Sequence, residues 1–143
     1  PENNEKFFAG CELNLVQWLG QFAAEKDQRD ETFLRGWLGR MLFTGEESQK
    51  KACVISGGER VRCMMSRAML KGSNVLIFDE PTNHLDLESI TSLNKGMINF
   101  KGPILFTSHD HELMQTVANR IIVINDTKEF DRHTTYNDYL GIN

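Results

Sequence analysis

The 143-residue sequence lacks the long apolar run of a membrane-spanning protein and the excess positive charge of a free-standing nucleic-acid binder, although a local basic face is compatible with it. No apolar run approaches the ~20 residues that span a bilayer, so we predict no membrane-spanning helix. The sequence starts with a polar stretch, and we therefore expect no signal peptide. Acidic residues outnumber basic ones and give a net charge of −4, whereas free-standing nucleic-acid binders usually present a basic patch. The remaining composition is typical of one soluble globular domain or a large piece of one.

Cysteine is also scarce. The three cysteines, Cys11, Cys53 and Cys63, are odd in number and show no C-x-x-C spacing. A reducing, cytoplasmic location accounts for this pattern most simply. A zinc site built from Cys53, Cys63 and a histidine is conceivable, but the sequence shows no metal-ligand spacing that favours it.

Residues 1–55 carry helical patterns but no recognisable chemistry. Apolar residues recur at helical spacing from 13 to 24 and again from 33 to 42, on either side of a charged stretch at 25–31. The aromatic stripes on these two helices could line a pocket, although packing in a core is the more common role. We therefore predict a small helical subdomain over 1–55, followed by a different unit over 56–143.

The second unit opens with Ser56-Gly57-Gly58-Glu59. Ser56 and Glu59 have the S-x-x-E spacing of a capping box, which predicts the start of a helix. Capping alone does not explain two glycines in the first helical turn, because glycine is a poor helix former. Glycines there expose backbone N–H groups at the positive end of the helix, where a phosphate can approach closely.

The apolar run Val75–Phe78 is followed at once by Asp79 and Glu80. A run this short and uniformly apolar predicts a strand that is buried on both faces of a parallel sheet. Acids at the carboxyl edge of such a strand lie where open α/β sheets bind their ligands. In nucleotide hydrolysis, Asp79 would hold Mg²⁺ and Glu80 would polarise the attacking water. A polar turn with solvated acids is the simpler alternative.

Further elements follow in regular order. Asp86 can cap a helix over 87–98, and 104–107 reads as a second buried strand that ends close to His109. A histidine at that edge could contact a phosphate, although a lone histidine is more often a surface residue. We also predict a short helix from 113, a strand at 121–124, a turn at 125–127 into an antiparallel strand around 128–130, and a last helix near 136–140.

Three of these motifs together resemble the ATP-binding cassette (ABC) family. Ser56-Gly57-Gly58-Glu59 resembles its signature loop, 75–80 resembles the Walker B strand with its catalytic glutamate, and Ser108-His109-Asp110 resembles the switch histidine. The resemblance covers roughly 11–140. It implies an α/β fold of the P-loop NTPase (ABC ATPase-like) type, here a fragment with a helical subdomain followed by part of a mostly parallel sheet.

The stretch Glu80-Pro81-Thr82-Asn83-His84-Leu85-Asp86 narrows the resemblance. Its Asn-His pair resembles the ABC-F subfamily, which consists of tandem cassettes without a membrane domain; many members bind the ribosome near the exit tRNA, and some confer antibiotic resistance. The ending at 136–140 also resembles an ABC-F cassette. Since no long inserted arm precedes Ser56, the chain is more similar to the second cassette than to the first.

The sequence departs from the family in lacking a G-x-x-x-x-G-K-[ST] loop, and Lys71-Gly72-Ser73 is not one. A glutamine loop is missing as well, and Ile55 replaces the usual leucine. We therefore expect a C-terminal piece of a cassette that does not turn over ATP alone. The sheet should also have a gap between 104–107 and 121–124, because the phosphate-loop strand of the family lies there.

The resemblance implies a role for each residue. Asp79 would bind Mg²⁺, Glu80 would act as general base and His109 would contact the γ-phosphate, all in cis. The signature residues Ser56, Gly57, Gly58 and Glu59 would close on ATP held by a second cassette, with Asp86 at the interface between cassettes. Expected partners are that cassette and the ribosome or tRNA. The alternatives are a transporter's nucleotide-binding subunit and a DNA-repair or chromosome-organising ATPase.

Overall fold

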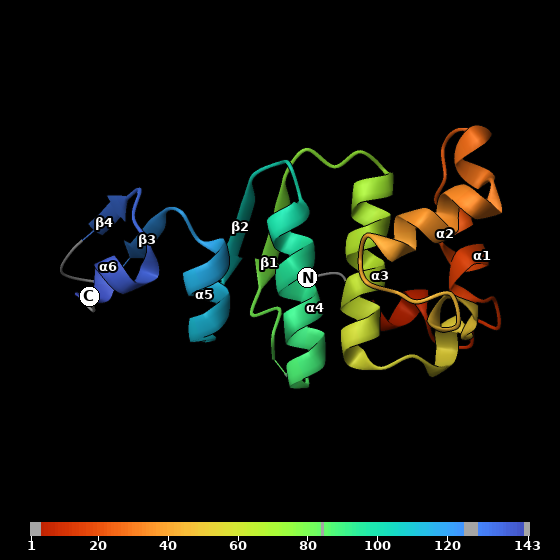
Figure 1. Cartoon of the computed structure of the whole chain (residues 1–143), viewed down its shortest axis with the longest axis horizontal. Coiled ribbons are helices and arrows are strands. Elements are labelled where there is room, and N and C mark those ends of the chain that lie inside the picture. Colours follow the sequence, from red (N-terminus) through yellow and green to blue (C-terminus); the bar gives the residue numbers. More distant parts are fainter. Residues whose placement is uncertain (1–3, 84, 125–128, 142–143) are drawn as a thin grey trace.

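The computed structural model describes residues 4–83, 85–124 and 129–141. These residues form an elongated molecule, with a helical region at one end, a helix-covered strand pair in the middle and a small hairpin unit at the other end (Figure 1). The helices are α1 (Leu15–Gly20), α2 (Glu31–Gly39), α3 (Gly57–Leu70), α4 (Leu87–Asn99), α5 (His111–Val117) and α6 (Tyr136–Leu140). The strands are β1 (Leu76–Asp79), β2 (Ile104–Thr107), β3 (Ile121–Ile124) and β4 (Glu129–Arg132). Four 3-10 turns add η1 (Asn4–Phe7), η2 (Asp27–Arg29), η3 (Glu47–Gln49) and η4 (Ala52–Val54).

The helical region is organised around buried aromatic and aliphatic side chains of α1 and α2. Trp18 is 1% exposed, stacks on Phe8 at a ring-centroid distance of 4.9 Å, and donates its indole N–H to the Phe7 carbonyl at 2.9 Å. Leu34 and Leu38 are buried on the facing side of α2. Burial and a satisfied indole N–H are what a core tryptophan requires. The aromatic stripe on α1, which includes Trp18, therefore packs in the core and does not line a pocket.

Helix α3 connects this region to the strands. It packs against α1, α2 and α4, and one continuous core of buried side chains runs from the helical region to β1 and α5. Cys63 of α3 lies fully inside this core, and burial raises the pKa of its thiol well above the ordinary value. Because the thiolate is the reactive form, Cys63 is an unreactive core residue.

Strands β1 and β2 pair in parallel, in a register that runs from Leu76 opposite Ile104 to Asp79 opposite Thr107. Helix α4 forms the connection between them. The connecting helix is the one predicted over 87–98, and the parallel pairing agrees with the mostly parallel sheet that the family resemblance implies. The parallel register brings the carboxyl ends of the two strands to the same edge, and the acids after β1 therefore lie beside the end of β2.

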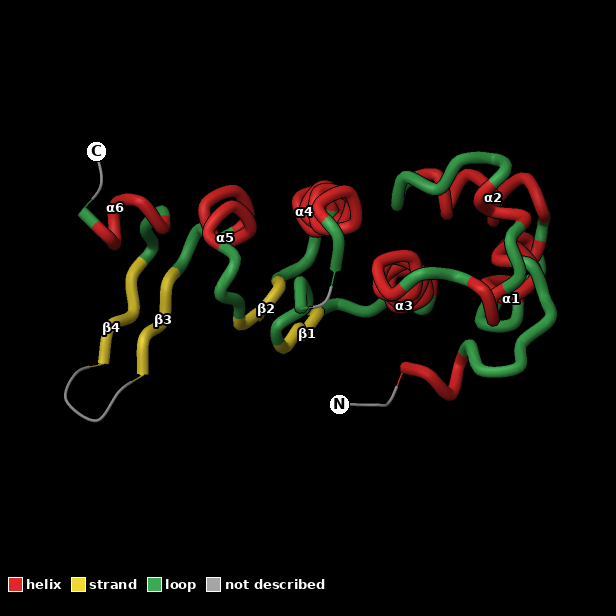
Figure 2. Tube along the Cα trace, turned by 90° about the horizontal axis from the view of Figure 1, so that it is seen from below, coloured by secondary structure: helices red, strands yellow, loops and turns green. Residues whose placement is uncertain are grey.

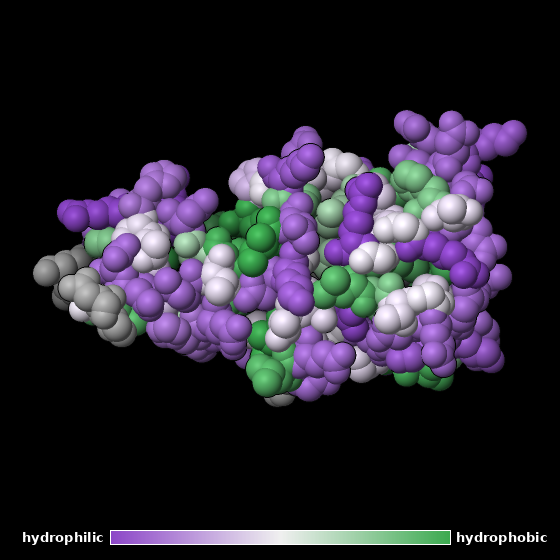
Figure 3. All heavy atoms as spheres, viewed as in Figure 1, coloured by the Kyte–Doolittle hydropathy of each residue, from purple (hydrophilic) through white to green (hydrophobic). Residues whose placement is uncertain are grey.

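The prediction that these strands are buried on both faces is wrong. Leu76 is 6% exposed, but its neighbours Ile77 and Leu105 are 75% and 57% exposed. Helices α4 and α5 lie on the same side of the pair, and no helix of the described residues covers the other side (Figure 2). In the space-filling view, apolar side chains gather around the middle of the molecule, while most of the remaining face is hydrophilic (Figure 3).

Strands β3 and β4 form a separate antiparallel hairpin, with Ile121 opposite Arg132. Within the described ranges, β3 pairs with β4 and not with β2. The two sheets thus leave the gap that was predicted between 104–107 and 121–124. A bidentate contact from Arg120 to Asp131, at 2.7 and 2.6 Å, fixes the open end of the hairpin. The predicted turn at 125–127 lies outside the described residues.

Candidate functional site

The predicted site residues lie in two groups. Ser56, Gly57, Gly58 and Glu59 lie at the start of α3, next to Asp86 at the start of α4, while Asp79, Glu80 and His109 lie at the carboxyl edge of β1 and β2. Among the residues the structure describes, no hydrogen bond or ion pair links the two groups. Each group therefore has its own local geometry.

The start of α3 is a complete capping box, as predicted. The Ser56 hydroxyl accepts a hydrogen bond from the Glu59 backbone N–H at 3.2 Å, and a carboxylate oxygen of Glu59 accepts one from the Ser56 N–H at 2.7 Å. These two bonds satisfy backbone donors that a helix start otherwise leaves open. The backbone of this helix start is accordingly well ordered before any ligand arrives.

Glu59 has a second partner in Lys50, whose ammonium lies 2.7 Å from the other carboxylate oxygen. Burial raises the pKa of Glu59, but the hydrogen bonds from Lys50 and Ser56 outweigh burial, and the pKa stays below its ordinary value. Glu59 is 7% exposed and remains ionised. A nearly buried carboxylate of this kind needs both donors, because an unpaired buried charge is costly.

The two glycines differ in their surroundings. A side-chain carbon at Gly58 would come within 1.9–2.2 Å of the Ser89 side chain of α4, while one at Gly57 would make only an ordinary 3.8 Å contact with Leu85. Gly58 is buried and Gly57 is exposed. The sequence pattern gave both glycines a role in phosphate approach, and the structure adds that Gly58 allows α3 to pack closely on α4.

Asp86 begins α4 in the way predicted. Its carboxylate accepts a hydrogen bond from the Ser89 backbone N–H at 2.8 Å, and hydrogen bonding to Ser89 lowers the pKa of Asp86. Since Ser89 also faces Gly58, the starts of α3 and α4 lie against each other. Two positive helix ends and the ionised Asp86 thus occupy one small region.

At the sheet edge, Thr107 connects the two acids. Its hydroxyl donates a hydrogen bond to Asp79 at 2.8 Å, and its hydroxyl and carbonyl oxygens both accept from the Glu80 backbone N–H, at 3.0 and 3.2 Å. Thr107 was not predicted as a site residue. Its position opposite Asp79 in the parallel register is the signal that would have identified it.

Glu80 lies in an unusual backbone conformation, with φ +46°, directly before Pro81. L-residues rarely adopt such angles, and strain of this kind costs about 1–3 kcal/mol and is concentrated at functional sites. One carboxylate oxygen of Glu80 lies 3.4 Å from Nε2 of His109, and the other is buried with no hydrogen-bond partner in the described part of the chain. The His109 side chain is 94% exposed. The edge therefore presents an incompletely bonded carboxylate, carried on a strained backbone, beside an exposed imidazole.

The edge also fits Mg²⁺. Asp79 is exposed, and one of its oxygens is held by Thr107. Among the described residues no group of three or more His, Cys, Asp or Glu side chains could hold a metal ion. Mg²⁺ usually binds through one or two carboxylates, substrate phosphates and water, so a single aspartate at the strand end is a suitable protein ligand for it.

Comparison with known proteins identifies the family. The family model described as "ABC transporter" matches residues 2–83, more than half of the chain. The chain belongs to the ABC transporter family. Within this family, YkpA of Bacillus subtilis, an ABC transporter ATP-binding protein, is 59% identical over 98% of the chain and 26% of its own length. ABC transporter F family member 5 of Arabidopsis thaliana is 35% identical over 85% of the chain and 17% of its own length.

A further ABC relative is the energy-dependent translational throttle protein EttA of Haemophilus influenzae, which is 37% identical over 64% of the chain and 16% of its own length. The chain thus spans about a quarter or less of these relatives. The solved dimeric ATP-binding cassette MJ0796, in a post-hydrolysis state with ADP and Pi, superposes with a TM-score of 0.66 at 17% identity. That match covers 89% of the chain and 60% of the cassette, and it confirms the predicted ABC ATPase fold. No helix of the described residues is long and apolar enough to cross a bilayer.

Proposed function

We propose that this chain is part of an ABC-F type protein that binds and hydrolyses ATP and acts on the ribosome in translation. The observation that carries the proposal is Glu80, whose backbone is strained and whose carboxylate is incompletely bonded beside His109 at the carboxyl edge of β1 and β2. In this proposal, residues 1–55 act as a helical subdomain and residues 56–143 carry the C-terminal part of the ATPase core.

Hydrolysis requires a water oxygen to attack the γ-phosphorus while a base takes up the proton and the bond from the γ-phosphorus to the bridging oxygen breaks, so that ADP leaves. In this proposal, Glu80 accepts that proton, and the exposed imidazole of His109 donates a hydrogen bond to the γ-phosphate. Mg²⁺, held through Asp79, would neutralise charge on the phosphates. Catalysis of this type depends on positioning and electrostatics, so Thr107 contributes by holding Asp79 and the Glu80 backbone.

The start of α3 would act on a different ATP molecule, held by a second cassette. Its N-terminus offers a positive helix end and, at Gly57 and Gly58, backbone N–H groups other than the two used by the capping box, and these suit a phosphate group. The related MJ0796 cassette forms a dimer, and this supports pairing of two cassettes here. Because the sequence contains no phosphate-binding loop, the 143-residue chain alone should not turn over ATP.

Two observations favour translation. One is the Asn83-His84 pair, of which Asn83 is described and exposed while His84 lies outside the described residues. The other is similarity to a protein named as a translational throttle. Antibiotic resistance is one form that such an activity would take, and the cytoplasm is where it would operate. The transporter description of the family model favours the alternative, a nucleotide-binding subunit of a transporter.

Ribosome co-sedimentation tests the proposal. Full-length Glu80→Gln should bind ATP but hydrolyse it slowly, and should therefore remain with ribosomes when ATP is present and leave them when ATP is absent. Glu112→Gln, which changes an exposed acid of α5 in the same way, is the control and should behave as wild type. If Glu80→Gln instead associates with membranes, or shows no ATP-dependent ribosome binding, the translational role is wrong.

A further inference from the structure

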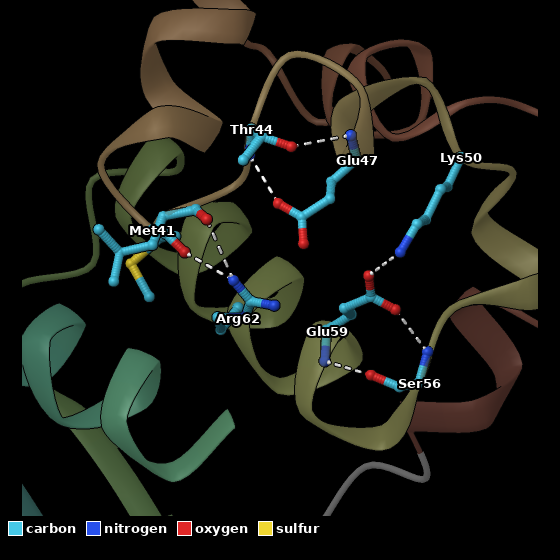
Figure 4. Close-up of polar contacts among 8 residues, drawn as sticks. Met41, Thr44, Glu47, Lys50, Ser56, Glu59 and Arg62 are labelled. Atoms are coloured by element: carbon cyan, nitrogen blue, oxygen red, sulfur yellow. Dashed lines mark hydrogen bonds and ion pairs between the residues drawn. The ribbon is translucent and has the colours of Figure 1, made fainter. Parts of the chain in front are cut away.

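Two cationic side chains connect the helical region with α3, one reaching from each side (Figure 4). Lys50, from the end of η3, reaches Glu59 in the first turn of α3. Arg62, one turn further along α3, reaches back and donates to the carbonyls of Met41 and Leu42 at 3.3 and 3.4 Å. The segment 41–50 and the start of α3 are therefore fastened at two points.

Glu59 connects the first of these contacts to the signature backbone. One of its carboxylate oxygens accepts from Lys50 and the other from the Ser56 N–H, both at 2.7 Å. Since the Glu59 side chain is only 9% exposed, little water is available to replace the Lys50 ammonium. Without Lys50, Glu59 would have to protonate or turn outward, and either change would weaken its hold on Ser56.

The backbone of Lys50 is itself held by the helical region. Its carbonyl accepts from the Leu15 N–H at 3.1 Å, and the neighbouring Gln49 side chain accepts from Asn14 at 3.0 Å. The turn that precedes Lys50 has its own capping pair, in which Thr44 and Glu47 exchange hydrogen bonds at 2.7 and 3.2 Å. The backbone that carries the Lys50 side chain is thus held in place by the helical region.

The second contact fixes the other end of the same segment. Arg62 is 6% exposed, lies over the Phe43 ring at 4.4 Å, and holds the carbonyl of Leu42, which adopts a left-handed conformation with φ +62°. A left-handed leucine is strained and persists because its surroundings hold it. With both ends fastened, a movement of segment 41–50 would move the start of α3 as well.

We propose that Lys50 is a positioning residue for the signature loop. It holds the Glu59 carboxylate, and through it the Ser56 backbone, in the geometry that meets the phosphate of ATP on the partner cassette, and it makes that geometry depend on the helical region. This inference rests on the proposed function, because it assigns the signature a role in ATP hydrolysis.

The test measures steady-state ATP hydrolysis by the full-length protein. Lys50→Met should lower kcat about tenfold with KM for ATP changed less than twofold, because the phosphate loop of the other cassette still binds ATP. Lys50→Arg should recover most of the rate. The control is Lys51→Met, the adjacent lysine, whose exposed side chain pairs with Glu12 and not with the signature; its kcat should match wild type.

A pH profile separates positioning from general destabilisation. Lys50 helps to lower the pKa of Glu59, so in Lys50→Met that pKa rises and the acid limb of the rate profile should move to higher pH. If Lys50→Met does not fold, Lys50→Gln, which keeps a donor but no charge, should show a smaller displacement in the same direction. Equal kcat and equal pH profiles for Lys50→Met and Lys51→Met would overturn the inference. Hydrolysis by Glu80→Gln at the wild-type rate would instead overturn the role of Glu80 on which the proposed function rests.

Discussion

The start of α3 and the carboxyl edge of β1 and β2 carry the two halves of the candidate site, and they differ in how fully their polar groups are bonded. At the start of α3, each carboxylate oxygen of Glu59 has a donor and the Ser56 hydroxyl has one as well. At the sheet edge, Glu80 has an orphaned oxygen and His109 is almost fully exposed.

This difference in hydrogen bonding corresponds to two different proposed roles, phosphate binding at the helix start and proton transfer at the sheet edge. A helix start that binds a phosphate through backbone donors must have a fixed backbone, and side-chain bonds supply that order in advance. A base and a phosphate contact must instead keep lone pairs and N–H groups free for the substrate. The start of α3, which is the bonded half of the site, is thus expected to tolerate few substitutions that change its packing. The sheet edge, which is the open half, is expected to tolerate few substitutions that change the chemistry of its side chains.

The strongest test of the open half is the hydrolysis rate of full-length Glu80→Gln. The amide keeps the shape of the side chain but cannot accept the proton from water, so ATP turnover should fall about 10²–10⁴-fold while ATP binding persists. Phosphate release measures turnover, and equilibrium binding of a fluorescent ATP analogue measures affinity. Unchanged turnover would show that Glu80 is not the base.

The packing of the bonded half is tested by a matched pair of glycine variants. Gly58→Ala would push a methyl group into Ser89 and should lower the free energy of unfolding by about 1–3 kcal/mol. At Gly57 an added methyl group would make only an ordinary van der Waals contact, so Gly57→Ala should change the free energy of unfolding very little. Chemical denaturation measures both. Adding Ser89→Gly to Gly58→Ala should restore most of the loss; equal stability of the two single variants would contradict the close packing.

A smaller effect is expected from the helix cap. Ser56→Ala removes the hydroxyl that accepts from the Glu59 N–H, which typically costs about 1 kcal/mol of stability. Ser56→Asn keeps a capping oxygen and should lose much less. Thermal unfolding of the two variants side by side decides the point, and a loss of the same size in both would mean that the hydroxyl does not act as the cap.

The smallest effect concerns pH. Because the folded-state pKa of Glu59 is lowered, its ionisation adds stability above its unfolded pKa of about 4.3, and this stability is lost as the pH falls through the lower folded value. Glu59→Gln should therefore be less stable than wild type by up to about 1 kcal/mol at pH 7, and this difference should shrink below about pH 4. Denaturation midpoints at several pH values measure it; a constant difference would exclude the ion pair as its source.

Local sequence patterns were enough to predict the order of the elements and the two capping residues, Ser56 and Asp86, because these depend on neighbouring residues alone. The parallel pairing of β1 and β2 was implied by the resemblance to the ABC family, and the structure confirms it. The exposure of Ile77 and Leu105 did not follow, since burial depends on which elements cover a strand.

The site was predicted in a similarly uneven way. The residues with expected roles could be chosen from their motif positions. Thr107, which supports Asp79 and Glu80, could be found only through the strand register, and no local pattern indicates Lys50 or Ser89. Lys50 precedes Glu59 by nine positions and no periodicity connects them, and their contact arises only because the helical region folds back onto α3. The steric limit at Gly58 is set by Ser89, thirty-one positions later, and no local pattern reveals it.

The backbone of Glu80 has a consequence for how this sequence can change under selection. At φ +46°, asparagine or glycine would lie at lower energy than glutamate, so stability alone would not retain glutamate at this position. Retaining it exchanges some stability for a carboxylate at the strand end. If Glu80 is the general base, as proposed, a lineage released from the need to hydrolyse ATP would lose this glutamate early and would become more stable when asparagine replaces it.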